Sequence, residues 1–377
     1  MKGSLLRKDK LLQALKVVAP GTVLREGLEN VVRAGTGALI VIGDSDEVME
    51  LVDGGFKINT EVMPANIYEL AKMDGAIIIS EDLKKILRAN AQLVPPANIA
   101  SRETGTRHRT AERVARQTGK LVISISQRRN VISLYMGSQK YIVKNSSDLL
   151  NKANQALQTL EKYRTSLDQA ISNLSMLEFN GYVTVYDVVK VLQRTEMFYR
   201  VVVEIERYIL ELGNEGRLVE MQLDELKGDY EVDGINVIRD YIPSQEMDDE
   251  NSEENDDQDE EDIKANYLEI WKKLGRMSSD EILSLEGIAR VLGYAADGGN
   301  ELDMIVIPRG YRILSKIPRL PFSVIENTVE MFGSLRNVMR ATIDELDAVD
   351  GIGEIRAKSI KDGLKRLKEM ISMEKYL

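Results

Sequence analysis

The feature that most constrains the fold is a long run of apolar residues spaced three and four positions apart. Neither glycine nor proline interrupts it, and the residues fall at positions 149, 153, 156, 160, 163, 167, 170, 174 and 177. This spacing places all of them on one face of an α-helix of about eight turns. Ser146 and Ser147 precede the run and are suitable N-cap residues. The sequence therefore predicts one long helix that buries its apolar face against other helices.

A second helix start follows at Thr184. Asp187 lies three residues further on, directly ahead of the apolar stretch VVKVLQ, in the arrangement of a capping box. Residues 148–310 are therefore predicted to be mostly helical. They contain no concentrated group of polar residues, and we interpret them as a spacer or assembly domain.

Residues 1–147 mix strand and helix patterns. Three short runs rich in β-branched residues are typical of buried strands, namely GALIVIG (37–43), GAIIIS (75–80) and KLVISIS (120–126). Helical stretches lie before and between them, at 23–33, 65–73 and 108–118. After the third run, QRRN, VISLYM, GSQ and KYIV indicate hairpins that close a sheet. The pattern predicts one α/β domain with a mixed sheet.

The composition excludes several kinds of site. The chain has no cysteine and a single histidine among its 377 residues. Disulfides, thiolate nucleophiles, cysteine-ligated zinc and any site built from several histidines are therefore ruled out. A hard cation held by carboxylates and by the phosphates of a ligand remains compatible with the composition.

No stretch approaches the roughly 20 apolar residues that a membrane-spanning helix needs. The first twenty residues are basic and leucine-rich, but Asp9, Lys10 and Lys16 interrupt any signal-peptide core. Their apolar residues at 5, 6, 12, 15 and 18 instead predict an amphipathic helix. We expect a cytoplasmic protein without a membrane partner.

The net charge of −11 is concentrated in one segment. Residues 246–262, EMDDENSEENDDQDEED, contain twelve acidic residues and no basic one, whereas the rest of the chain carries 49 acidic and 50 basic residues. Such a run buries little apolar area and repels itself, so we interpret it as a solvated, disordered insertion. A segment that mimics nucleic acid or holds DNA off is the alternative interpretation.

The single histidine, His108, lies in the hexapeptide GTRHRT. Arg107 and Arg109 flank it and carry guanidinium groups that suit phosphate oxygens. Thr106 and Thr110 add hydroxyl donors. A helical pattern begins here, and the open N–H groups and the dipole of a helix N-terminus favour an anion. The cluster predicts a polyphosphate cradle, with an exposed basic helix start as the alternative. The histidine ring itself could donate to phosphate, stack on a base or only pack.

A second candidate element is the stretch MDGAIIIS, in which Asp74, Gly75 and Ala76 stand between a helix and a strand. Small residues at such a place let a ligand approach the backbone closely. Asp74 is then available to bind a ribose hydroxyl or a metal ion. Alone the pattern is weak, because Asp-Gly is first of all a turn signal.

Together the two elements resemble a known enzyme family. Asp-Gly-Ala before a strand, followed some thirty residues later by Gly-Thr-Arg-His-Arg-Thr-Ala at the start of a helix, is similar to the diadenylate cyclase domain. NAQLVPP (90–96) lies between them and looks like that family's segment contacting adenine. The resemblance covers most of residues 1–147. A helical spine and an end entered through PRGYRILSKIPRLP (308–321) make the chain similar to the DNA-integrity scanning members of the family.

The resemblance implies that two ATP molecules condense into cyclic di-AMP and release two pyrophosphates. Two domains would meet face to face, and the 3′-hydroxyl of each nucleotide would attack the α-phosphate of the other. Such chemistry depends mainly on positioning and charge neutralisation. Asp74 is implied to orient or deprotonate the 3′-hydroxyl, beside Mg²⁺ or Mn²⁺ as cofactor.

The resemblance also implies roles for other residues of the site. Those implied to hold the triphosphate are Thr106, Arg107, Arg109 and Thr110, and His108 is implied to belong to the nucleotide site between the two arginines. Those implied to contact the nucleoside are Gly75, Ala76 and Leu93. The residues implied to take part in catalysis are Asp74, Arg107, His108 and Arg109. Ser126, Arg128 and Arg129 fit either a phosphate contact or a charged hairpin turn.

The segment ELDAVDGIGEIRAKSIKDGLKRL (345–367) has the pattern of a helix-hairpin-helix. Its turn is formed by Gly351, Ile352 and Gly353, whose backbone N–H groups can reach phosphate oxygens. Lys358 and Lys361 follow on the second helix as further DNA contacts. IPRLP (317–321) is interpreted as a degenerate first hairpin. Such binding reads the DNA backbone and shape rather than sequence. A plain protein–protein module is the alternative.

The sequence therefore predicts three domains: an α/β cyclase domain (1–147), a helical spine with the acidic insertion (148–310) and a helix-hairpin-helix domain (311–377). The resemblance implies a homo-octamer assembled through paired cyclase domains, with branched or damaged DNA as partner and a role in DNA damage and repair. The rival hypothesis from another class is a non-enzymatic DNA-binding scaffold whose nucleotide fold only senses ATP.

Overall fold

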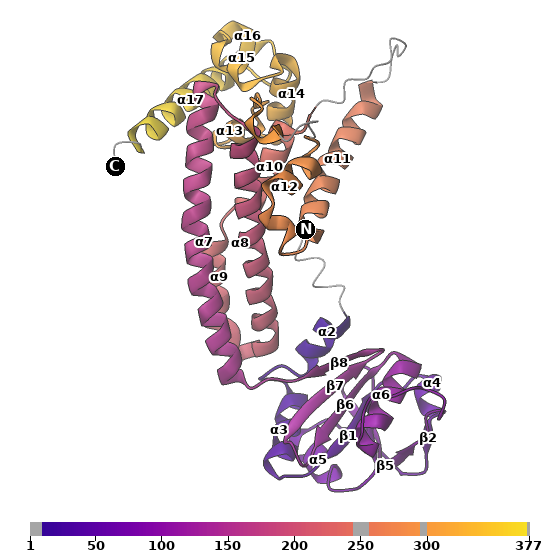
Figure 1. Ribbon diagram of the computed structural model, residues 1–377. Coiled ribbons are helices and arrows are strands. Elements are labelled where there is room, and N and C mark those ends of the chain that lie inside the picture. Colours follow the sequence, from indigo (N-terminus) through magenta and orange to yellow (C-terminus); the bar gives the residue numbers. More distant parts are fainter. Residues whose placement is uncertain (1–9, 244–255, 295–299, 375–377) are drawn as a thin grey trace. The chain divides into compact units, whose positions relative to one another are not determined.

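The structure is a computed structural model that describes residues 10–243, 256–294 and 300–374. The chain divides into two compact units, and most of their helices and strands are labelled in Figure 1. The first unit comprises residues 1–157 and 203–224, and the second comprises 158–202 and 225–377.

The first unit is built on a mixed sheet, as predicted. The strands lie in the order β2-β5-β4-β1-β6-β7-β8, and β3 also pairs with β5. The central strand β1 is parallel to β4 and antiparallel to β6. The strand bounds are Ala38–Ile42 (β1), Val52–Asp53 (β2), Phe56–Glu61 (β3), Ala76–Ile79 (β4), Lys85–Leu93 (β5), Leu121–Ser126 (β6), Val131–Met136 (β7) and Gln139–Ile142 (β8).

Helices cover both faces of this sheet (Figure 1). Along β1 the side chains alternate, so that Ile40 lies in the core on one face and Val41 in the core on the other. Residues of α2 (Lys10–Val17), α3 (Val23–Arg33) and α5 (Pro64–Leu70) pack into the first core. Residues of α4 (Asp46–Met49) and α6 (Thr106–Thr118) pack into the second.

The predicted elements of this unit have close counterparts. The three apolar runs become β1, β4 and β6, and the helix predicted at 23–33 is α3. The helix predicted at 108–118 begins two residues earlier, at Thr106, because Gly105 is the N-cap. Strands β2, β3 and β5 were not predicted. They are more polar and lie toward one side of the sheet, and β3 has no fully buried side chain, so no continuous apolar run marks them in the sequence.

Residues 203–224 pack with the α/β domain, although the sequence had placed them in the spine. They contain the end of α8 (Val185–Leu212), a short 3-10 helix (Gly213–Gly216) and most of α9 (Arg217–Lys227). Leu210 packs against the first core, and the Tyr141 hydroxyl donates to Glu211 over 2.5 Å. The compact unit therefore extends beyond residue 147 because a distant segment completes its apolar surface.

The second unit is helical and contains most of the predicted spine. α7 (Ser146–Asn180) confirms the long helix, and its buried residues follow the predicted spacing, for example Leu160, Leu167 and Leu174. At the start of α8, the backbone N–H of Thr184 donates to Oδ2 of Asp187 over 3.0 Å, which is one half of a capping box, and the Thr184 hydroxyl donates to the same oxygen over 2.6 Å. The remaining helices of the spine are α10 (Tyr230–Tyr241), α11 (Asp256–Arg276) and α12 (Leu285–Leu292).

The last part of the acidic run is helical. Its first part, up to residue 255, lies outside the described residues. Its last part, residues 256–262, forms the first turns of α11, which is a correction to the sequence-based interpretation. The later turns of α11 bury Ile270, Trp271 and Leu274. Burial of those three side chains stabilises the helix of which residues 256–262 are the first turns.

The C-terminal end of the second unit contains two helix pairs with short turns. The first pair is α13 (Tyr311–Ser315) and α14 (Phe322–Phe332), and the second is α16 (Ile343–Asp347) and α17 (Glu354–Glu374). α15 (Leu335–Arg340) lies between them in the chain. They share one core that includes Ile317, Val349 and Ala357. In the described part of the chain, every helix is too short or too polar to cross a membrane.

Candidate functional site

Strand direction brings the predicted site residues to one edge of the sheet. β1 and β4 are parallel, so Ala38 and Ala76, which begin these strands, lie at the same edge. β5 and β6 run antiparallel to them, so Leu93 and Ser126, which end those strands, lie at this edge too. Because adjacent strands are about 4.8 Å apart, residues from all four strands are within reach of one nucleotide.

Arg107 reaches this edge from α6. A Cβ atom on Gly37, the residue before β1, would lie 2.0 Å from Nη1 of Arg107 and 3.1 Å from the carbonyl oxygen of Ile125. The guanidinium group therefore rests against the backbone of β1 and β6, in space that a glycine leaves open. The beginning of α6 is thus in contact with the edge of the sheet that carries the Asp-Gly-Ala turn.

The N-terminus of α6 is open. Gly105 is its N-cap, and no side chain accepts a hydrogen bond from the first turn. The first intrahelical hydrogen bond runs from the N–H of Arg109 to Gly105, which leaves the N–H groups of Thr106, Arg107 and His108 ahead of it. Together with an exposed Thr106, these groups give α6 an open N-terminus rich in hydrogen-bond donors, which is compatible with the predicted polyphosphate cradle.

His108 packs against β7. Its Nδ1 atom lies 3.0 Å from the Tyr135 hydroxyl, and the two rings meet edge to face. Burial lowers the pKa of His108, with the charge of Glu103 opposing this and the charge of Lys140 adding to it. Burial and the Glu103 carboxylate also raise the pKa of Tyr135 well above its ordinary value. Of the three roles left open for the histidine, the structure provides the packing contact.

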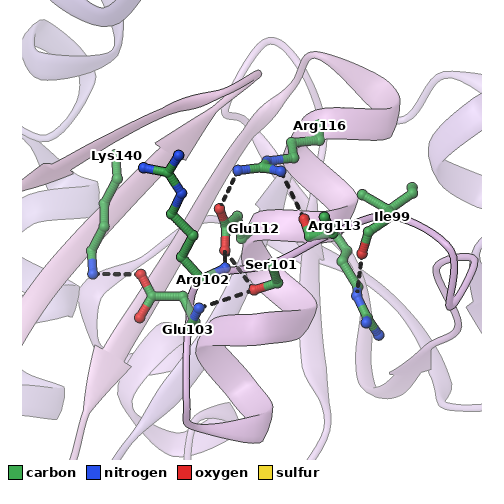
Figure 2. A network of polar contacts seen from close by, with 9 residues as sticks. Ile99, Ser101, Arg102, Glu103, Glu112, Arg113, Arg116 and Lys140 are labelled. Atoms are coloured by element: carbon green, nitrogen blue, oxygen red, sulfur yellow. Dashed lines mark hydrogen bonds and ion pairs between the residues drawn. The ribbon is translucent and has the colours of Figure 1, made fainter.

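A polar network fixes the loop that leads into α6 (Figure 2). Glu112 accepts from the Ser101 hydroxyl over 2.5 Å and from the Arg102 N–H over 3.0 Å, and it pairs with Arg116 at 2.6 Å. Arg113 donates to the carbonyl oxygen of Ile99 over 2.8 Å. Two arginines and one glutamate of α6 therefore hold loop residues in place. Sequence reasoning missed them, and their recurrence along one helix at positions 112, 113 and 116 was the available signal.

Arg109 and Glu103 belong to the same loop. The Arg109 guanidinium donates to the carbonyl oxygens of Glu103 (3.4 Å) and Thr104 (3.3 Å). The Glu103 carboxylate pairs with Lys140 of β8 over 2.5 Å. Burial opposes ionisation of Glu103, but Lys140 more than compensates and lowers its pKa. Arg109 is still exposed, so its long, weak bonds to the loop leave it free to turn toward a phosphate.

The Asp-Gly-Ala turn joins α5 to β4. Asp74 is exposed, and within the described residues its carboxylate has no hydrogen bond or ion pair. The N–H of Gly75 donates to Oδ1 of Asn90 over 3.1 Å. Ala76 is buried and pairs with Ala91 of β5. An unpaired, solvent-facing carboxylate on a fixed turn is suited to a substrate hydroxyl or to a cation.

Leu93 occupies the end of β5, but its side chain is buried in the second core. A ligand at this edge would therefore meet the backbone of Leu93 rather than its side chain. Ser126, Arg128 and Arg129 form the β6–β7 hairpin, in which the Asn130 N–H donates to the Ser126 carbonyl over 2.9 Å. Arg128 and Arg129 are exposed on that turn.

The donors present fit a divalent cation that is shared with a nucleotide. Among the described residues there is no group of three or more histidine, cysteine or acidic side chains that could hold a metal ion by themselves. Asp74 offers one free carboxylate, and Mg²⁺ is commonly held by one or two carboxylates together with substrate phosphates. The site therefore fits an ion that arrives with its substrate.

The second hairpin has the expected open turn. Gly351 has φ +79°, a conformation that favours glycine, and a Cβ atom on Gly353 would meet nothing. Ile352 is buried, so only its backbone faces outward. Lys358 pairs with Glu354 over 2.6 Å and is exposed. Lys361 instead donates to the Met339 carbonyl over 3.0 Å at the end of α15, so part of its role is to tie α17 to that helix.

The first hairpin repeats the second with an offset of 32 residues. In the first hairpin the backbone N–H of Ile317 donates to the carbonyl oxygen of Leu314, and that of Leu320 donates to Ile317. The second hairpin has the same two backbone bonds, from Val349 to Leu346 and from Ile352 to Val349. Arg319 takes the place of Gly351 and has φ +62°. IPRLP thus forms a hairpin, as interpreted, in which an exposed arginine replaces the first glycine and Pro321 the second.

Comparison with known proteins agrees with this arrangement. The chain matches three family descriptions: DisA bacterial checkpoint controller nucleotide-binding (residues 25–140), DisA bacterial checkpoint controller linker region (143–300) and helix-hairpin-helix motif (334–363). DNA integrity scanning protein DisA of Clostridium botulinum (strain Loch Maree / Type A3) is 54% identical over 98% of this chain and 99% of its own length. The chain belongs to the DisA family. DisA proteins of Clostridium kluyveri and Clostridium acetobutylicum are also 54% identical, over 98% and 99% of this chain and 99% of their own lengths.

Membership of the DisA family decides between the two hypotheses of the sequence analysis. The protein is a diadenylate cyclase, a nucleotidyltransferase that makes cyclic di-AMP from ATP, and it carries a helix-hairpin-helix DNA-binding motif. The reaction requires a divalent metal ion. ATP and DNA are therefore its partners, and the scaffold hypothesis is set aside.

Proposed function

We propose that the sheet edge formed by β1, β4, β5 and β6 binds one ATP per chain and that Asp74 serves the reaction there. The observation that carries this proposal is the contact of Arg107 with Gly37 at the start of β1. β1 is the neighbour of β4, which Gly75 precedes. The phosphate-binding end of α6 and the only acidic residue of the Asp-Gly-Ala turn therefore face one ligand.

The proposed roles follow from exposure and charge. Arg107, Arg109 and the open N–H groups of α6 hold the triphosphate, with hydroxyls of Thr106 and Thr110 as added donors. Gly75, Ala76 and the backbone of Leu93 contact the nucleoside. Asp74 orients the 3′-hydroxyl and takes its proton as the 3′ oxygen attacks the α-phosphorus. The bond from that phosphorus to the β-phosphate bridging oxygen breaks, and pyrophosphate leaves.

His108 is proposed to act through α6 rather than on the substrate. Its contact with Tyr135 fixes the first turn of the helix and hence the two flanking arginines. The proposed ion is Mg²⁺ or Mn²⁺, held by Asp74 and the phosphates. When bound, it would neutralise phosphate charge and lower the pKa of the attacking hydroxyl.

Two features of the working protein go beyond one chain. Each chain offers one nucleotide site, and the reaction joins two nucleotides twice, so two cyclase domains must face each other. We propose a cytoplasmic homo-octamer assembled through such pairs. We also propose that the two hairpins bind the DNA backbone independently of sequence, with branched or damaged DNA as the preferred form.

The direct test is a product assay. The purified chain is incubated with ATP and either Mg²⁺ or Mn²⁺, and products are separated by chromatography and identified by mass. We expect cyclic di-AMP with two pyrophosphates per molecule of product. Linear dinucleotide, ADP or unchanged ATP as the outcome would overturn the proposed site.

A further inference from the structure

Asn90 interrupts β5 opposite the Asp-Gly-Ala turn. The ladder between β4 and β5 pairs Ala76 with Ala91 but Ile78 with Arg88, so β5 carries one extra residue in this interval. Such a bulge re-aims a side chain and occurs often beside active sites. Asn90 lies in the bulge with φ +51°, in the left-handed region that asparagine tolerates better than most residues.

The bulge brings Asn90 into close contact with Gly75. A Cβ atom on Gly75 would lie 2.3 Å from the carbonyl carbon of Asn90 and 2.5 Å from its Cα. The two backbones therefore touch, and only a glycine permits it. Oδ1 of Asn90 accepts the hydrogen bond of the Gly75 N–H at 3.1 Å. One residue of β5 thus meets Gly75 through both its backbone and its side chain.

This contact determines where Asp74 points. Asp74 is the residue before Gly75, and its own carboxylate has no partner among the described residues. The backbone of the turn therefore sets the direction of its Cα–Cβ bond, from which the carboxylate extends. On the α5 side the turn is held by the hydrogen bond of the Met73 N–H to Leu70, and on the sheet side by the bond of Gly75 to Asn90.

We propose that Asn90 is a positioning residue, whose carboxamide and left-handed backbone fix the Gly75 N–H and thereby aim the Asp74 carboxylate. This inference rests on the proposed role of Asp74 and extends it to the residue that holds it. Asn90 does not touch the reacting atoms. Loss of the Asn90 carboxamide would displace the Asp74 carboxylate, and a displacement of about 1 Å can lower the rate by about a hundredfold.

Three substitutions separate the two contributions of Asn90. Asn90→Gly keeps the left-handed backbone and removes the acceptor. Asn90→Asp keeps an acceptor oxygen at the same place and tolerates the same φ. Asn59→Gly is the matched control, because Asn59 lies in β3 with φ +50° and has no hydrogen bond to the turn.

Steady-state kinetics of cyclic di-AMP synthesis by the full chain gives the decisive readout. We expect Asn90→Gly to lower kcat by roughly 10- to 100-fold and to raise KM for ATP by a smaller factor, because the phosphate-binding residues are on α6 although Gly75 contacts the nucleoside. Asn90→Asp should recover most of kcat, and Asn59→Gly should stay near the parent value. Near-parent kcat in a folded Asn90→Gly variant would overturn the proposal. So would an equal loss in Asn90→Asp, or a loss confined to KM.

A second readout does not depend on activity. The Gly75 amide is followed by hydrogen exchange and by its chemical shift in labelled protein. We expect exchange to speed up at least tenfold in Asn90→Gly and to remain slow in Asn90→Asp. If this pattern holds but the parent chain makes no cyclic di-AMP, the proposed function fails while the positioning contact stands. If the parent and the control are active and the Gly75 amide is unchanged in Asn90→Gly, the positioning proposal alone fails.

Discussion

The Tyr135 hydroxyl lies 3.0 Å from Nδ1 of His108 and fixes the only histidine of the chain against β7. Burial lowers the pKa of this histidine below its ordinary 6.5, while the neighbouring Glu103 charge opposes the shift. The ring is therefore neutral at physiological pH. A neutral, packed histidine suits a role in holding the start of α6 and leaves the charge of the site to the two arginines.

A single histidine makes this prediction directly measurable by NMR. His108 should titrate below pH 6.5 in the parent chain, and Glu103→Gln should lower its pKa further, because it removes a charge that favours protonation. Because the pKa of His108 is lower in the folded state than in the unfolded state, the neutral ring contributes to the stability of the fold above pH 6.5. This contribution is lost as the pH falls through the pKa of the folded state. Titration at or above 6.5 in the parent would contradict the buried, neutral ring.

Asp74→Asn should abolish synthesis of cyclic di-AMP while fold and assembly persist. Asp74 is exposed and its carboxylate has no partner among the described residues, so its replacement by an isosteric amide leaves no buried group unsatisfied. Turnover is measured beside the thermal midpoint. Asp44→Asn, an exposed acid after the opposite end of β1, is the matched control and should keep the parent rate. Comparable turnover in both variants would remove Asp74 from the mechanism.

Arg107→Ala together with Arg109→Ala should weaken ATP binding. Charge-assisted hydrogen bonds contribute roughly 1.5–3 kcal/mol each, so each arginine corresponds to about a tenfold or larger loss in affinity. Calorimetry with a non-reacting ATP analogue measures the change, and Arg33→Ala on the exposed end of α3 is the control. DNA affinity should not change, because both arginines lie in the other unit. Unchanged ATP affinity would mean that α6 does not hold the phosphates.

How much of the fold the sequence predicts depends on whether the pattern is local or arises from pairing between distant segments. The β1, β4 and β6 strands and α7 were predictable because burial on one or both faces imposes a strict apolar pattern. The bulge at Asn90 was not, since it arises from the pairing of β5 with β4, and nothing local in the sequence reports that register. The same holds for Glu112, whose partners Ser101 and Arg102 are eleven and ten residues away.

Composition misled where tertiary contacts compete with it. The acidic run suggested disorder up to residue 262, but burial of residues such as Trp271 later in the same helix extends α11 back to Asp256. Lys361 carries the charge expected of a DNA contact, yet its ammonium group caps α15. In both cases a contact made elsewhere in the chain, and not the charge of the residues themselves, determines the structure.

A buried carboxylate gives the second unit a pH-dependent stability. Asp240 accepts hydrogen bonds from the N–H groups of Gly310 and Tyr311 at 2.7 Å each and of Arg312 at 3.0 Å. Burial and the charge of Glu178 nevertheless raise the pKa of Asp240 to about 7. A raised carboxyl pKa means that this contribution to stability is complete below the unfolded value and is lost as the pH rises through about 7.

The measurement compares the parent chain with Asp240→Asn by urea unfolding between pH 5.5 and 8.5, a range of roughly 1.5 units on either side of that pKa. We expect the variant to be less stable at low pH, because an amide donor faces one of the three N–H groups. The difference between the two should shrink as the pH rises, since only the parent then bears a buried charge. A difference that stays constant across this range would show that the carboxylate is ionised throughout and would contradict the raised pKa.

The last prediction concerns Arg319, which stands in the first hairpin where the second has Gly351. Its φ of +62° costs a residue with a Cβ atom roughly 1–2 kcal/mol, so a glycine would fit the turn better. A conformationally unfavourable arginine at an exposed turn is explained if its guanidinium binds DNA phosphate. Arg319→Gly should then leave the unfolding midpoint unchanged or higher and yet weaken DNA binding.

Arg319→Gly is expected to keep or raise stability and to lower DNA affinity, so a loss of binding cannot be attributed to a loss of fold. We expect a three- to tenfold loss in affinity for branched DNA and a decrease of about one in the slope of log affinity against log salt, as for one lost phosphate contact. Arg336→Gln, an exposed charge on α15 outside both hairpins, is the control for net charge. If the two variants lose the same affinity, the effect is that of charge alone. If Arg319→Gly binds DNA as the parent does, the first hairpin serves only to pack Ile317 against α17, where a Cβ on Gly363 would lie 3.1 Å from it.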